Sequence, residues 1–277
     1  MTSFIDKTVE EALEYTRRSL ISVSRENGLL QSIDPSISFL SSVALLITTV
    51  TCKDVKTLAL LFLVSVSLAV LSRVPLKEYF SRVFFFIPLF TLIVALPSIF
   101  SPITPGRNLF TVWASANIYI SEEGVLHALI FVFRVTVAVS FPVLLVLCLG
   151  WDSVVDGMAG IGVPAIMVEI LAMTYRYAVT MMNTAIEMLL SKKSRIAGDE
   201  SFLRSWKWSG ELLGALFMKT NRMCSDIFMA MVSRGFSGEI KMNRKPKFRG
   251  RDAVFLLIVI SLCVLVIMGE TPVPSLF

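Results

Sequence analysis

The stretch VLHALIFVFRVTVAVSFPVLLVLCLG, residues 125 to 150, determines the class of this protein. Its 26 residues are almost all apolar and include one histidine, His127, and one cation, Arg134. A hydrocarbon core of about 30 Å needs roughly 20 apolar residues in each helical span. The stretch is long enough to cross a bilayer at a tilt. The sequence therefore predicts an integral membrane protein.

The composition of the whole chain agrees with this assignment. Of its 277 residues, 55% are hydrophobic and 17% are charged, with a mean hydropathy of +0.74. Soluble domains average about 45 to 50% apolar and about 25% charged residues. The predicted fold class is all-α, a polytopic membrane protein with about five transmembrane helices. The expected spans are residues 36 to 52, 55 to 72, 83 to 100, 125 to 150 and 253 to 269.

Turn and breaker residues delimit these spans. Asp34-Pro35 marks a turn and the start of the first helix, and Lys53-Asp54 predicts a tight hairpin between the first two spans. Pro142 is expected to kink the fourth span. The segment from Ser101 to Gly124 contains two prolines and is expected to be a loop.

The distribution of cations predicts the orientation. With the N-terminus inside, 22 of the 26 Lys and Arg residues lie in inner segments and three in outer ones, as the positive-inside rule requires. We therefore expect a multi-pass protein of the cell membrane whose C-terminus lies outside. The expected domains are a cytoplasmic segment (1–35), transmembrane helices 1 to 4 (36–150), a cytoplasmic domain of long helices (151–252) and a C-terminal transmembrane helix (253–277).

Several classes of function are disfavoured. The chain has no phosphate-binding G-x-x-x-x-G-K-[ST] motif, so we do not expect it to hydrolyse ATP itself. His127 is the only histidine and lacks an obvious acidic partner, so we predict no catalytic residues, no metal ligands and no cofactor. The four cysteines lie far apart in the sequence, and we expect them to be unreactive thiols. Most basic residues lie next to membrane spans, where the positive-inside rule accounts for their excess. We therefore do not expect nucleic acid to be a partner.

Two long helices are predicted within the cytoplasmic block. In the first, from Ala165 to Lys193, a polar stripe follows one face and includes Glu169, Arg176, Thr180, Asn183 and Glu187. In the second, from about Gly210 to Val232, the stripe is formed by Lys219, Arg222 and Asp226. Of the 13 methionines, 11 fall between positions 158 and 242. They either fill a core or form a surface that adapts to more than one partner.

Each long helix ends in a similar motif. Ser194-Arg195-Ile196 follows the first helix and Ser233-Arg234-Gly235 follows the second, and a Glu follows each Arg at the same spacing, as Glu200 and Glu239. An Arg at a helix C-terminus complements the helix dipole, which is a purely structural explanation. The repetition also suits two guanidinium groups that dock into two equivalent acidic grooves, because guanidinium pairs with carboxylates in a fixed fork.

Two further cations have open roles. Arg176 pairs with Glu169 or Asn183 in a structural role, or it takes part in coupling. Arg134 lies about nine residues inside its span, where a lone cation is a functional candidate. It contacts backbone carbonyls near Pro142, lies at a buried contact with another subunit, or serves transport directly.

At these residues the sequence resembles the transmembrane T component of energy-coupling factor (ECF) transporters, and most closely the cobalt-type (CbiQ) family. The resemblance covers most of the chain and includes Asp34-Pro35, Gly162-Val163-Pro164, the run from Glu169 to Tyr177 and the two Arg motifs. Members of this family typically carry two Ala-Arg-Gly signatures that end the coupling helices. Ser233-Arg234-Gly235 differs from the signature by one small residue. Ser194-Arg195-Ile196 also lacks the glycine.

The resemblance implies a non-enzymatic scaffold of an ATP-driven importer. Such a T component joins a dimer of ABC-type ATPases to a small substrate-binding membrane (S-type) subunit and transmits the ATP-driven motion through its coupling helices. The site residues it implies here are Ser194, Arg195, Ile196, Ser233, Arg234 and Gly235. For cobalt-type members the cargo is Co²⁺, bound by the partner subunit.

Alternatives remain at this point. The chain could serve nickel or a vitamin in place of cobalt, or act as a stand-alone secondary carrier. A carrier would need ionisable or broken-helix sites near the membrane midplane and an inverted repeat. A membrane-embedded enzyme is a third reading.

Overall fold

The structure, a computed structural model, describes residues 28–52, 54–84, 87–99, 108–113, 118–195, 202–236 and 249–269. The chain divides into two compact units. The bundle unit comprises residues 24–161 and 246–277, and the paired-helix unit comprises residues 1–23 and 162–245. Each unit is described by itself.

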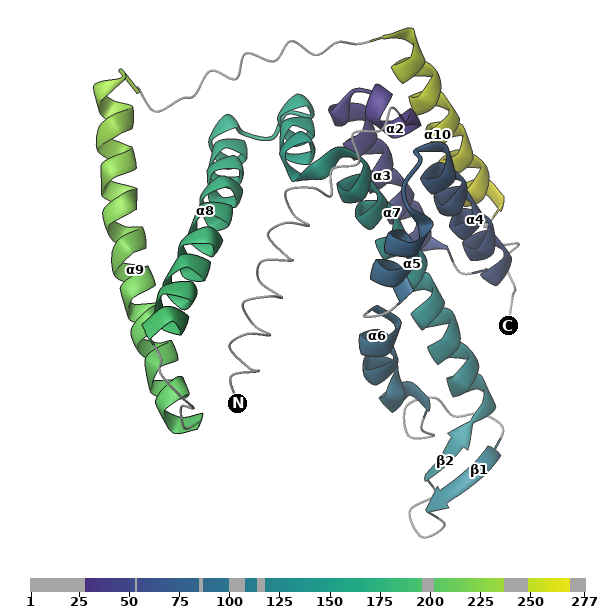
Figure 1. The fold of residues 1–277 in the computed structure, drawn as a ribbon. Helices are drawn as coiled ribbons and strands as arrows, with labels where there is room; N and C mark the ends of the chain where they lie inside the picture. The colour runs from purple at the N-terminus through teal and green to yellow at the C-terminus, as the bar shows by residue number, and fades with distance from the viewer. Residues whose placement is uncertain are drawn as a thin grey trace. The chain divides into compact units, whose positions relative to one another are not determined.

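The described residues are predominantly helical, which confirms the all-α fold class (Figure 1). The paired-helix unit holds α8 (Ala165–Arg195) and α9 (Phe202–Ser233). The bundle unit holds α2 (Leu29–Ser32), α3 (Pro35–Thr51), α4 (Val55–Leu71), α5 (Leu76–Phe84), α6 (Ile87–Ala95), the 3₁₀ helix η1 (Leu96–Ile99), β1 (Asn108–Trp113), β2 (Ile118–Ser121), α7 (Glu122–Gly160) and α10 (Gly250–Gly269).

The start of α3 confirms the prediction from Asp34-Pro35. The Asp34 carboxylate accepts a hydrogen bond from the Ser36 amide at 2.9 Å, and Pro35 occupies the first helical position. An aspartate at this place satisfies an amide that the helix leaves unpaired, and proline there loses no helical hydrogen bond. α4 begins at Val55, soon after α3 ends at Thr51.

A buried carboxylate links the starts of α3 and α10. Asp252, only 1% exposed, accepts the Arg249 amide at 2.9 Å and the Asp34 amide at 3.4 Å. The Asp252 amide in turn donates to the Arg249 carbonyl, so the first turn of α10 is closed by reciprocal bonds in the manner of a capping box. This role of Asp252 was not predicted from the sequence.

α7 contains one non-helical residue, Gly150, which was not expected, and the kink expected at Pro142 stays a prediction. Gly150 has φ 74° and ψ 162°, whereas Pro142 stays inside the helix. A positive φ is far easier for glycine than for other residues.

The described residues of the expected third span, residues 83 to 100, belong to two α-helices and a 3₁₀ helix. α5 ends at Phe84, α6 runs from Ile87 to Ala95, and η1 follows. Pro88 lies in the first turn of α6, where its missing amide costs no helical hydrogen bond. The expected loop from Ser101 to Gly124 also contains structure, because β1 and β2 pair as an antiparallel hairpin.

Two hydrophobic clusters hold the bundle unit together. The first joins α3, α4, α7 and α10 around Leu58, Leu61 and Val137, which are fully buried. The second joins α2, α4, α5 and α7 around Tyr79, whose hydroxyl lies 2.9 Å from Ser65 Oγ. α7 contributes to both clusters, so it is the central helix of this unit.

Three helices in the described part of the chain are long and apolar enough to cross a membrane: α7, α8 from Ala165 to Lys192, and α10. α3 and α4 are apolar but shorter, with 17 residues each, which is near the lower limit for a span. α8 meets the criterion by length and composition, although the sequence analysis assigned it to the cytoplasmic block.

The end of α7 packs closely against the start of α3. A Cβ atom on Gly157 would lie 2.6 Å from the Pro35 carbonyl oxygen. No ordinary side chain fits at that distance without a backbone shift. Gly157 therefore allows the helix that follows Gly150 to cross α3 at its first turn.

Candidate functional site: the arginine tips of a helix pair

The sequence placed the main functional residues at the ends of α8 and α9. Two contacts join these helices: Thr220 Oγ1 lies 3.0 Å from Met181 Sδ, and Lys192 Nζ lies 4.0 Å from the centre of the Trp208 ring. Later residues of α8 contact earlier residues of α9, so the two helices are antiparallel, as Figure 1 shows. Their C-termini therefore lie at opposite ends of the pair.

The second motif ends α9 with a complete stop signal. The Phe236 amide donates to the Met231 carbonyl at 3.1 Å, and the Gly235 amide donates to the Val232 carbonyl at 3.0 Å. Gly235 has φ 81°, so this is a Schellman motif with glycine in its usual left-handed position. Arg234 is the residue between helix and glycine, and its side chain is exposed.

The first motif ends α8. Arg195 is the last helical residue and its side chain is exposed. Ile196 lies outside the described residues. Arg195, like Arg234, therefore lies at a helix C-terminus, where the helix dipole favours positive charge.

The two motifs also share a local hydrogen bond. Ser194 Oγ donates to the Ser191 carbonyl, and Ser233 Oγ donates to the Ala230 carbonyl, both at 2.9 Å. Each serine thus bonds the carbonyl three residues before it and stands directly before the arginine. We refer to Ser194-Arg195 and Ser233-Arg234-Gly235 as the two arginine tips.

The antiparallel arrangement separates the tips by about one helix length. α9 has 32 residues, which corresponds to about 48 Å at about 1.5 Å per residue. One small ligand cannot contact both tips at this separation. Two separate binding partners, or two sites on one large partner, can contact them.

The expected polar stripe of α8 is largely solvent-accessible. Arg176, Thr180, Asn183 and Glu187 are exposed, and Glu169 is half-buried. Among the described residues, Arg176 makes no ion pair with Glu169 and no hydrogen bond with Asn183 through its side chain. The structure therefore does not contain the structural pairing that the sequence suggested for Arg176.

The methionines of α8 and α9 are not a buried core. None of those that the structure describes is buried, and four are exposed. The exposed ones are Met167, Met182, Met218 and Met229. Exposed apolar side chains of other types surround them, including Phe217 at 72% and Phe228 at 58%. A large, adaptable apolar surface therefore accompanies the two tips.

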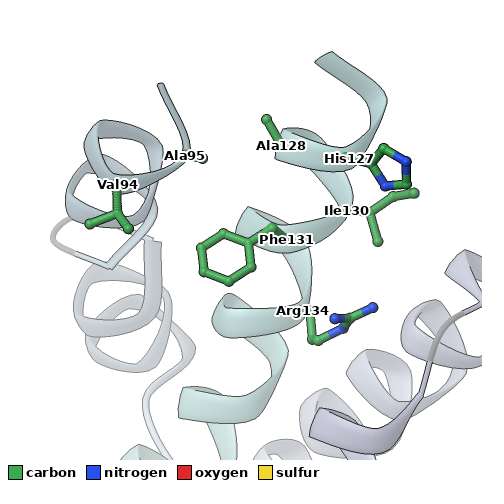
Figure 2. A pocket seen from close by; sticks show the side chains of 7 residues that line it. All are labelled: Val94, Ala95, His127, Ala128, Ile130, Phe131 and Arg134. Atoms are coloured by element: carbon green, nitrogen blue, oxygen red, sulfur yellow. The ribbon is translucent and has the colours of Figure 1, made fainter. Parts of the chain in front are cut away.

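Arg134 belongs to α7 of the bundle unit. It lines a cavity of about 350 Å³ together with His127, Ala128, Ile130 and Phe131 of α7 and with Val94 and Ala95 of the α6 end (Figure 2). Its buried Nε atom has no hydrogen-bond partner among the described residues. This atom therefore does not bond the backbone carbonyls near Pro142, which was one of the roles that the sequence left open.

Other chemistry-bearing residues are dispersed in the described part of the chain. No group of three or more His, Cys, Asp or Glu residues there could hold a metal ion. Cys52, Cys148 and Cys263 are buried free thiols, as expected for inert cysteines, and Cys224 is exposed on α9. Sequence reasoning missed the contact of Lys192 with Trp208, because the ends of α8 and α9 give no pattern that reveals their pairing.

Comparison with known proteins gives consistent matches over most of the chain. The profile of the cobalt transport protein family, CbiQ, matches residues 26–246. An uncharacterized protein of Methanocaldococcus jannaschii is 36% identical over 267 residues, which are 96% of this chain and 91% of the relative. The energy-coupling factor transporter transmembrane protein EcfT of Lactococcus lactis subsp. cremoris is 24% identical over 255 residues, which are 87% of this chain and 94% of the relative.

Proposed function

Because this chain belongs to the cobalt transport protein (CbiQ) family, we propose that it is the transmembrane coupling subunit, or T component, of an ECF-type ABC importer. It is a membrane-embedded protein of a transporter family. The similarity to an energy-coupling factor transporter transmembrane protein supports the same role. In this role the chain is not an enzyme, and ATP is hydrolysed by partner subunits.

The observation that carries the proposal is the equivalence of the two arginine tips. Each is an exposed guanidinium at a helix C-terminus, preceded by a serine that bonds the carbonyl three residues earlier. The antiparallel pair places them about one helix length apart. A dimer of ATPases offers two equivalent acidic grooves, one for each tip, and a pair of planar guanidinium groups matches carboxylates there.

In this mechanism the helix pair transmits motion. When ATP binding and hydrolysis move the two ATPases, each pulls on one tip, and α8 and α9 change their arrangement. The exposed Met-rich surface of these helices supports contact with a substrate-binding membrane subunit, since methionine can repack against more than one conformation of a partner. The partner then reorients and releases its cargo inside the cell.

The cargo we propose is the cobalt ion, held by the membrane partner. The printed description of the family supports this substrate. Nickel or a vitamin are the alternative cargoes. Uptake of radiolabelled Co²⁺ and Ni²⁺ by cells that produce the complete transporter distinguishes the two ions, and labelled vitamins test the third possibility.

The orientation we propose follows the cation distribution. Residues 1–35 and 151–252 lie in the cytoplasm, residues 36–150 and 253–277 contain the spans, and the C-terminus lies outside. This places both arginine tips on the side where ATP is available. α8 then lies at the cytoplasmic face, although it is long and apolar enough to span.

The test of this function is retention of the ATPases. The full chain is co-expressed with them and with the membrane subunit, and then purified by a tag on this chain. Truncating one arm of a desolvated charge pair costs roughly 2 to 5 kcal/mol. Arg195→Ala and Arg234→Ala should therefore each weaken ATPase retention and uptake, and the double variant should abolish both.

The matched control is Arg222→Ala. Arg222 is exposed on α9, well before Arg234 along the helix and away from either tip. Its replacement should leave ATPase retention and uptake unchanged. The proposal is wrong if the double variant retains the ATPases and transports normally.

A further inference from the structure

Arg134 is a cation without a visible partner deep in a membrane helix. It is half-buried, and its Nε atom is buried without a hydrogen-bond partner among the described residues. Intramembrane cations almost always pair with another group, because an unpaired charge in hydrocarbon is costly. None of the contacts described above therefore supplies a partner for the Arg134 guanidinium.

The position of Arg134 along α7 restricts that partner. Arg134 lies between the start of α7 at Glu122 and the break at Gly150, somewhat nearer to the start. Its separations from these two residues correspond to roughly 18 Å and 24 Å along the helix. If this segment is centred in a hydrocarbon core of about 30 Å, Arg134 lies roughly 12 Å from the nearer interface. Lipid phosphates lie outside the core, which disfavours a lipid headgroup as the partner.

The surroundings of Arg134 provide space and an apolar surface for an incoming helix. The cavity of about 350 Å³ lies between α7 and the end of α6 (Figure 2). In Figure 2 the side chains of His127, Ile130 and Arg134 extend from one side of α7, and Phe131 points toward Val94. Among the apolar residues that line the cavity, Val94 is 69% exposed and Phe131 is 40% exposed.

Lipid tails can cover these apolar side chains at little cost, but they cannot neutralise the guanidinium. The charge therefore distinguishes this place from the rest of the apolar surface. A carboxylate at the same depth, carried by another transmembrane helix, satisfies the guanidinium with a bidentate pair and covers the apolar surface at the same time.

We propose that Arg134 binds an aspartate or glutamate side chain on a transmembrane helix of the substrate-binding membrane subunit, with the cavity that Arg134 lines as the docking site. This inference rests on the proposed T-component function. It adds a second attachment point for the membrane subunit, in the bundle unit and separate from the helix pair. It also requires that the partner carry an acid within one of its spans.

The test uses the complete transporter, purified by a tag on this chain, with three variants. Arg134→Gln removes the charge, Arg134→Lys keeps it, and Arg82→Gln removes an exposed cation at the end of α5 as a control. Loss of a buried charge pair should lower retention of the membrane subunit by about tenfold or more in Arg134→Gln. Arg134→Lys should retain more of it than Arg134→Gln, and Arg82→Gln should match the unmodified chain.

A charge exchange makes the test specific. Each Asp or Glu in the spans of the membrane subunit is replaced by Arg, one at a time, in combination with Arg134→Glu. One of these combinations should restore retention of the subunit. A membrane subunit with no acid in its spans, or no restoring combination, overturns the proposal.

Three other results also contradict it. If Arg134→Gln retains the membrane subunit fully, the site has another role. If it loses tightly bound anionic phospholipid but keeps the subunit, the ligand is a lipid headgroup. If the isolated variant chain unfolds at a lower temperature, Arg134 acts within this chain. ATPase retention is measured in the same samples, so failure of the proposed function, in which no ATPase copurifies with the unmodified chain, is distinguished from failure of this inference.

Discussion

The ammonium of Lys192 lies 4.0 Å from the centre of the Trp208 ring and thereby joins the last turns of α8 to the first turns of α9. A cation over an indole face contributes about 0.5 to 2 kcal/mol, depending on its exposure. Both side chains are half-buried. The contact therefore stabilises the connected end of the helix pair.

Replacing Trp208 by Ala should loosen this end. We expect faster amide hydrogen exchange in the last turns of α8 and the first turns of α9, with little change in α3 or α4. Trp208→Phe keeps an aromatic face and should have a smaller effect. Hydrogen-exchange mass spectrometry of the full chain in detergent measures this. Unchanged exchange in Trp208→Ala would show that the contact does not hold the pair together.

Gly235→Ala should disturb the tip that contains Arg234. Gly235 has φ 81°, and a left-handed conformation costs a residue with a Cβ atom about 1 kcal/mol or more. The last turn of α9 should fray, and ATPase retention should fall although Arg234 is still present. Gly214→Ala is the control, because a Cβ atom there has no neighbour within 4 Å. Equal ATPase retention in both variants would contradict a role for the Schellman motif.

Gly157→Ala should destabilise the bundle unit. The new Cβ atom would lie 2.6 Å from the Pro35 carbonyl oxygen, so either α7 or the start of α3 must move. Such overpacking typically costs about 1 to 3 kcal/mol. The thermal unfolding temperature in detergent should fall, whereas Gly210→Ala, with no neighbour within 4 Å, should leave it unchanged or raise it slightly.

The single exposed thiol among the described residues offers a test of orientation. Cys224 is exposed on α9, whereas Cys52, Cys148 and Cys263 are buried. A membrane-impermeant maleimide should label Cys224 in inside-out vesicles and not in right-side-out vesicles. Cys224→Ser should abolish the labelling. Labelling in right-side-out vesicles would place α9 outside and contradict the proposed topology.

Local signals in the sequence predicted much of the fold. Asp34-Pro35 predicted the start of α3, because a capping carboxylate and a first-turn proline act within three residues of each other. Apolar runs predicted α3, α4 and α10, and one long run predicted α7. These features depend on the local chain and on the bilayer thickness, and neither requires knowledge of tertiary contacts.

The structure differs from the sequence-based predictions where contacts between distant residues determine the local conformation. Pro142 is a breaker in isolation, yet it stays inside α7, and Gly150 adopts the non-helical conformation. The two β-strands carry a local signal, because Phe110 to Trp113 and Ile118 to Ile120 are rich in β-branched and aromatic residues. The local structure of the second arginine tip was predictable from Gly235, whereas the antiparallel pairing that separates the two tips was not.

The most direct test of the central claim is ATP-driven transport by purified components. Proteoliposomes that contain this chain, the ATPases and the membrane subunit should take up labelled substrate only with ATP, and the Arg195→Ala, Arg234→Ala double variant should abolish uptake. This chain alone should transport nothing. ATP-independent uptake by this chain alone would show that it is a self-sufficient carrier and not a coupling subunit.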